Sequence, residues 1–102
     1  MKSALAIQCL PLAASGKPKE EVYKLVDAAI DIIARSGLPY TVGPFETVIE
    51  GPADQLFDIA RRAHQAIIDA GSSSVASYIK IFSSPDLGSS EEKTGKYRKV
   101  GH

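Results

Sequence analysis

The chain lacks several features that would direct its interpretation. It has one cysteine, so Cys9 cannot form an internal disulfide, and one cysteine with two histidines makes no zinc-binding set. Twelve basic side chains are balanced by twelve acidic ones, which argues against nucleic-acid binding because phosphate contacts need a basic excess or stripe. No stretch approaches the roughly 20 apolar residues of a membrane-spanning helix. We therefore expect a cytoplasmic protein that binds neither nucleic acid nor a membrane.

The length of 102 residues corresponds to one small domain. A chain this short buries roughly 60–65% of its unfolded surface, which leaves little reserve of stability and favours oligomerisation. Residues 4–14 resemble a secretory signal, but Gln8 and Pro11 interrupt the apolar run and favour a first strand. The C-terminal stretch has almost no apolar content. We expect a domain over residues 1–83 and a flexible tail over residues 84–102.

Two segments have the spacing of amphipathic helices. Apolar residues recur every three or four positions over residues 22–33 and again over residues 56–70. Gly37 follows the first segment and Gly71 the second, which is typical of helix ends. The sequence therefore predicts two helices with one apolar face each.

Four other segments have the pattern of strands. Residues 3–12 and 74–82 alternate between two sets of side chains, and two short strands are predicted at residues 40–43 and 45–50 on either side of Pro44. The order β-α-β-β-α-β predicts an α+β, ferredoxin-like sandwich, in which two helices cover one face of a four-stranded antiparallel sheet.

The second face of that sheet has no predicted cover. It carries Ala6, Leu10 and Val48, a set too apolar to be left entirely to water in a stable monomer. The last strand is long and apolar and lies at a sheet edge in this topology. We therefore expect a homo-oligomer, either a dimer or a tetramer.

Several phrases of the sequence together resemble a known family. They are IQCLPL at residues 7–12, SGLPY at 36–40, GPFETVIEG at 43–51 and SYIKI at 77–81, with His64 in the second helix. In this order and spacing they are similar to the small single-domain thiamine-binding proteins related to bacterial YkoF. The resemblance covers residues 3–82. It implies a ferredoxin-like fold, assembly into dimers or tetramers, and binding of thiamine or its hydroxymethylpyrimidine moiety without a known reaction or a further cofactor.

The residue types suit such a ligand. An aminopyrimidine has ring acceptors, an amino donor and a flat face, so it needs polar groups at its edge and an apolar or aromatic wall. A thiazolium cation would favour an aromatic face or a carboxylate, as Glu50, Glu46 or Tyr78 could provide. The candidate ligand-binding residues are Thr47, Glu50, Tyr40, Ser77, Phe45, Gln8 and His64.

Several of these candidates also have a structural explanation. Thr47 could be a β-branched core residue, Glu50 a solvated charge, and Ser77 a hydroxyl that needs a partner among aliphatic neighbours. Thr47 and Glu50 leave opposite sides of an ideal strand, so they reach one ligand only if the strand bulges or a second subunit contributes one of them. His64 could simply be bonded at the flank of its helix.

Two other functions are open. The same scaffold could be a regulatory or interaction module whose faces build an oligomer, or a small hydrolase. Residues 14–17 lack the glycine spacing of a phosphate-binding loop, and Cys9 on an apolar strand would carry little thiolate to pair with His64. We therefore favour a binding protein that is not an enzyme.

Overall fold

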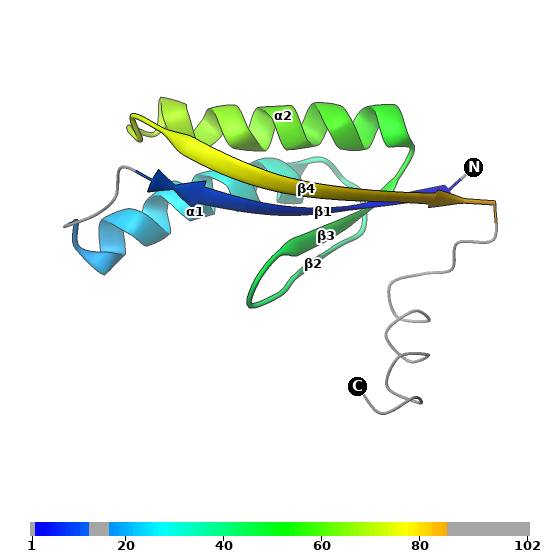
Figure 1. Cartoon of the computed structure of the whole chain (residues 1–102), viewed down its shortest axis with the longest axis horizontal. Helices are drawn as coiled ribbons and strands as arrows, with labels where there is room; N and C mark the ends of the chain where they lie inside the picture. The colour runs from blue at the N-terminus through cyan, green and yellow to red at the C-terminus, as the bar shows by residue number, and fades with distance from the viewer. Residues whose placement is uncertain (1, 13–16, 86–102) are drawn as a thin grey trace.

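The computed structural model describes residues 2–12 and 17–85. In chain order its elements are β1 (Lys2–Pro11), α1 (Lys19–Arg35), β2 (Tyr40–Val42), β3 (Thr47–Gly51), α2 (Ala53–Asp69) and β4 (Val75–Ser84). All pairings in the sheet are antiparallel, and the strand order is β2-β3-β1-β4. Figure 1 shows β1 and β4 as a long pair beside the shorter hairpin of β2 and β3. The predicted α+β, ferredoxin-like fold is confirmed.

The core lies between the sheet and the two helices. Leu5 and Ile7 of β1 and Ile49 of β3 point to the helices, as their alternation along the strands requires. The helices contribute one buried stripe each: Leu25, Ala29 and Ile33 from α1, and Leu56, Ile59, Ala60, Ala63 and Ile67 from α2. Burial of these side chains is the main stabilising contribution, at about 1.5–3 kcal/mol for each large aliphatic group.

The register places the remaining strand residues on the opposite, open face. Ala6 of β1 pairs with Val48 of β3 on one side and with Lys80 of β4 on the other, so all three share that face. By the same alternation, Tyr78 and Phe82 of β4 lie there too, 60% and 55% exposed. The predicted residues Ala6 and Val48 therefore lie on the open face, as does Leu10 opposite Ala76, and Tyr78 and Phe82 add to them.

The hairpin between β2 and β3 differs from the prediction. The Gly43 N–H donates to the Glu46 carbonyl over 3.0 Å, which closes a loop of Pro44 and Phe45. A Cβ atom at position 43 would lie 2.9 Å from that carbonyl, so the close approach requires glycine. The strand predicted from residue 45 begins at Thr47 instead, because Phe45 belongs to the loop.

The C-terminal end of the chain lies partly outside the residues that the structure describes. Ser84 is the last residue of β4, while residues 86–102 of the predicted tail lie outside the described residues. Among the helices that the structure describes, none has the length and apolar character needed to cross a membrane.

Candidate functional site

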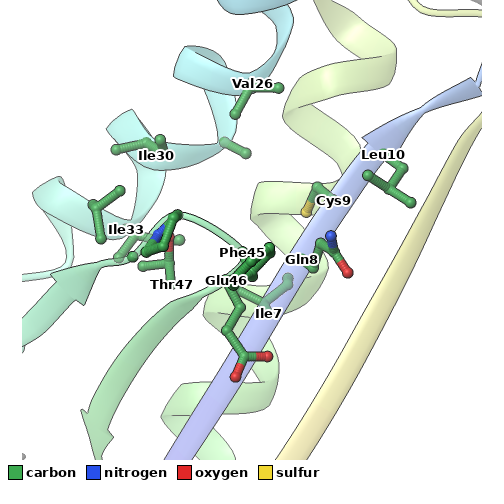
Figure 2. A pocket seen from close by; sticks show the side chains of 14 residues that line it. Ile7, Gln8, Cys9, Leu10, Val26, Ile30, Ile33, Phe45, Glu46 and Thr47 are labelled. Carbon is green, nitrogen blue, oxygen red and sulfur yellow. The ribbon is translucent and has the colours of Figure 1, made fainter.

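A cavity of about 230 Å³ opens between α1, the second half of β1 and the β2–β3 hairpin. Figure 2 shows Val26, Ile30 and Ile33 of α1 across the cavity from Cys9 and Leu10 of β1. The lining residues are Ile7, Gln8, Cys9, Leu10, Val26, Ala29, Ile30, Ile33, Val42, Gly43, Pro44, Phe45, Glu46 and Thr47. Small-molecule sites typically have this character, with aliphatic walls and few polar groups.

The cavity exists because β1 is longer than its neighbour. The β1–β3 ladder ends at the pair Ile7 and Thr47, whereas β1 continues to Pro11 alongside β4. Beyond Ile7 the hairpin loop turns away, so no strand fills the space next to Cys9. The pairing of the sheet therefore leaves a gap that α1 covers from the helix side.

Few polar groups line this gap. Thr47 is only 7% exposed and lies on the helix side, opposite Ile7. Phe45, by contrast, is 79% exposed in the hairpin loop, at the mouth of the cavity. Thr47 thus offers a buried hydroxyl, and Phe45 offers an aromatic ring that a flat ligand could contact.

A carboxylate also lies at the rim. The two oxygens of Glu46 lie 3.1 and 3.2 Å from Lys80 Nζ, across the open face from β4. Lys80 is largely exposed, so this ion pair contributes little to stability, at about 0–1 kcal/mol. Glu46 is therefore available to a cationic group at low energetic cost.

Behind the cavity wall, three polar side chains form a connected chain. His64 Nδ1 on α2 lies 2.6 Å from Ser77 Oγ on β4, and the Ser77 hydroxyl donates to Cys9 Sγ over 3.4 Å. Burial raises the pKa of the Cys9 thiol, and the hydrogen bond from Ser77 opposes this only in part. At neutral pH Cys9 therefore presents a neutral thiol rather than a thiolate nucleophile.

The structure brings together some of the predicted site residues and separates others. Gln8, Phe45 and Thr47 line the cavity, and Ser77 and His64 reach its wall through Cys9. Glu50 pairs with Ala4 on the open face, three positions from Thr47 along a strand whose register shows no bulge. Tyr40 pairs with Ile49 at the far end of β2. Within one subunit, therefore, Glu50 and Thr47 do not converge.

Sequence reasoning missed part of the site. Cys9 was not among the candidate ligand-binding residues, yet it lies in the cavity wall and at the end of the polar chain. The signal for it was its alternation with Leu5 and Ile7 on the helix side of β1. The described residues contain no group of histidine, cysteine and acidic side chains that could hold a metal ion.

Comparisons with known proteins agree with this fold. The family model described as thiamine-binding protein matches residues 5–98. A UPF0045 protein of Clostridium perfringens is 33% identical over 94 residues, which are 92% of this chain and 95% of that protein. The structure of a domain of unknown function, DUF77, from Bacillus cereus superposes with a TM-score of 0.82 at 39% identity, covering 98% of this chain and 93% of that one.

A more distant structure shares the fold. It belongs to a candidate thiamine biosynthesis/salvage protein of Thermotoga maritima, with a TM-score of 0.78 at 23% identity, and the match covers 96% of this chain and all (100%) of that one. At this identity the likeness concerns the fold alone.

Proposed function

The chain belongs to the thiamine-binding protein family, and from this premise we propose that it binds thiamine or its hydroxymethylpyrimidine moiety without catalysing a reaction. The observation that carries the proposal is the cavity beside Cys9, which has an aliphatic wall from α1 and few polar groups at its rim. A flat ring with a polar edge suits such a site. The cytoplasmic location expected from the composition is part of the same proposal.

The cavity residues can be assigned to parts of the ligand. The pyrimidine ring would lie against the aliphatic side chains of Val26 and Ile30, with the Thr47 hydroxyl as a hydrogen-bonding group on the helix side. The Gln8 amide, whose side chain lies on the open-face side of β1, would reach the ring from the other side. Phe45 would cover the ring at the mouth of the cavity. In thiamine, the thiazolium cation would then lie near the Glu46 carboxylate at the rim.

The other predicted site residues would act indirectly or from another subunit. Ser77 and His64 would position Cys9 in the wall, because His64 bonds to the Ser77 hydroxyl and that hydroxyl donates to the Cys9 sulfur. Glu50 lies on the open face, so it would reach a ligand in the cavity of a neighbouring subunit. We assign the same role to Tyr40, which is 42% exposed and does not line the cavity.

We include a homo-oligomer, a dimer or a tetramer, in the proposal. The open face holds Tyr78 and Phe82 beside the small residues Ala4 and Ala6, and an exposed apolar face of this kind is typical of a contact surface. β4 also forms one edge of the sheet over ten residues, with β1 as its neighbouring strand in the part of the chain that the structure describes. The same observations favour the second candidate function, an interaction module whose surfaces serve assembly alone.

A calorimetric titration separates these two functions. Purified protein is titrated with hydroxymethylpyrimidine, thiamine and the thiamine phosphates, and its mass in solution is measured with and without ligand. The proposed function predicts saturable binding of at least one of these ligands, with unchanged ligand recovered afterwards. An oligomer that binds none of them at millimolar concentration would leave the interaction module as the function.

A further inference from the structure

The hydrogen bonds of the sheet determine which main-chain groups of β1 face the cavity. The Leu12 N–H donates to the Ser74 carbonyl over 3.1 Å, so the N–H and C=O groups of even-numbered residues of β1 point toward β4. Those of odd-numbered residues point toward β3. The Glu50 N–H donates to the carbonyl of Pro39, the residue just before β2, so even-numbered residues of β3 turn their main-chain groups toward β2 and odd-numbered ones, such as Thr47, face β1. The hydrogen bonds of β1 with β4 and those of β3 with β2 therefore both leave the odd-numbered residues of β1 and β3 to pair with each other.

On the side of β1 that faces β3, one residue has both its main-chain N–H and its C=O without a partner strand. Ile7 is the last odd-numbered residue with a β3 partner, Thr47. Cys9 follows with no β3 residue opposite it, because the position that would continue the ladder is Phe45 in the hairpin loop. Pro11 comes next and has no N–H to donate. The open edge thus offers the N–H and C=O of Cys9 and, beyond them, the C=O of Pro11, which is too short for another strand.

We propose that the main chain of Cys9 is the specificity-determining contact of the cavity and pairs with the acceptor–donor edge of a planar nitrogen heterocycle. The inference rests on the proposed function and identifies the edge of the ligand that the protein recognises. An aminopyrimidine has a ring nitrogen that accepts a hydrogen bond beside an amino group that donates one. This is the complement of the N–H and C=O of one strand residue, the pair that an opposing strand would otherwise supply.

The surroundings fit a ring held in this way. A ring paired with a strand edge lies close to the plane of the sheet, so one of its faces turns to the helix side. There Val26 and Ile30 of α1 provide an aliphatic surface. The side chain of Cys9 also points to the helix side, where Ser77 bonds to its sulfur, so the thiol and the main-chain edge face different directions. Because Ser77 and His64 hold the Cys9 side chain without entering the main-chain edge, they are positioning residues for the Cys9 peptide.

Amide hydrogen exchange measured by NMR tests this inference directly. In the free protein the Cys9 amide is expected to exchange much faster than the Ile7 amide, which is paired with Thr47 and serves as the internal control. With saturating hydroxymethylpyrimidine, exchange at Cys9 should slow at least tenfold while Ile7 is unchanged. The same pyrimidine without its amino group should bind about 5- to 150-fold more weakly, because the Cys9 carbonyl would lose its donor.

The outcomes separate the inference from the proposed function. If calorimetry shows binding of hydroxymethylpyrimidine but the Cys9 amide stays unprotected, the inference is overturned and the proposed function stands. Protection of Cys9 already in the free protein would also overturn it, since another group would then occupy the edge. If no pyrimidine binds at millimolar concentration, both fail together.

Discussion

His64 Nδ1 on α2 lies 2.6 Å from Ser77 Oγ on β4, and this contact links the helix layer to the wall of the cavity. The Ser77 hydroxyl has one hydrogen, which it donates to Cys9 Sγ. With that hydrogen committed to Cys9, the tautomer of His64 with its proton on Nδ1 completes the chain by donating to the Ser77 oxygen. A polar chain of this kind between two layers is stabilising only while all its members are bonded.

Substitution of Ser77 by alanine should therefore be costly. It leaves the partly buried imidazole of His64 without its partner, and we expect the free energy of unfolding to fall by about 1–3 kcal/mol. Urea denaturation of Ser77→Ala measures this, with Ser73→Ala at an exposed position as the control. Equal stability of the two variants would show that the chain has no energetic role.

The pKa of Cys9 predicts how stability depends on pH. Burial raises the pKa of this thiol above the ordinary value of 9.0, so the folded state holds the proton more tightly than the unfolded state. The resulting stabilisation is fully present below pH 9.0 and is lost as the pH rises through the folded-state pKa. Unfolding of the parent and of Cys9→Ala is compared from pH 7 upward. Parallel curves would contradict the prediction.

Much of this architecture could be predicted from the sequence, because local alternation determines it. The two sets of residues along β1 and β4 indicated which side chains face the helices and which form the open face, and the register agrees. The error at Phe45 arose because alternation alone does not separate the end of a strand from a two-residue loop. That error concealed the cavity, which depends on where β3 stops.

The polar chain was beyond prediction for a different reason. The sequence indicated that Ser77 needs a partner among aliphatic neighbours. The identity of that partner depends on how α2 packs over β4 and β1, which brings His64 and Cys9 to the same hydroxyl. Such contacts between layers have no signature in the spacing of residues along the chain.

The positions of Thr47 and Glu50 on opposite faces predict a site shared between subunits. Thr47→Val and Glu50→Gln should each weaken pyrimidine binding, by about 1–3 kcal/mol. If the two residues come from different subunits, mixed oligomers of the two variants should regain a fraction of tight sites, which calorimetry counts. Glu50→Gln protein that binds as tightly as the parent would exclude Glu50 from the site.

Assembly through the open face predicts a charge-sensitive oligomer. Phe82→Glu places a carboxylate on that face and should shift the protein toward monomer in light scattering. Phe57→Glu provides the matched control, since Phe57 on α2 is 51% exposed and Phe82 is 55% exposed. A monomeric parent at tens of micromolar, or equal masses for the parent and Phe82→Glu, would argue against this interface.

Binding in the cavity beside Cys9 is tested by titrating hydroxymethylpyrimidine into the parent and into two variants of α1. Val26→Phe fills the cavity, whereas Val22→Phe makes the same change one turn earlier, at a residue that does not line it. We expect the parent and Val22→Phe to bind alike and Val26→Phe, although folded, to bind at least tenfold more weakly. Equal binding by all three proteins would show that the ligand does not bind in this cavity.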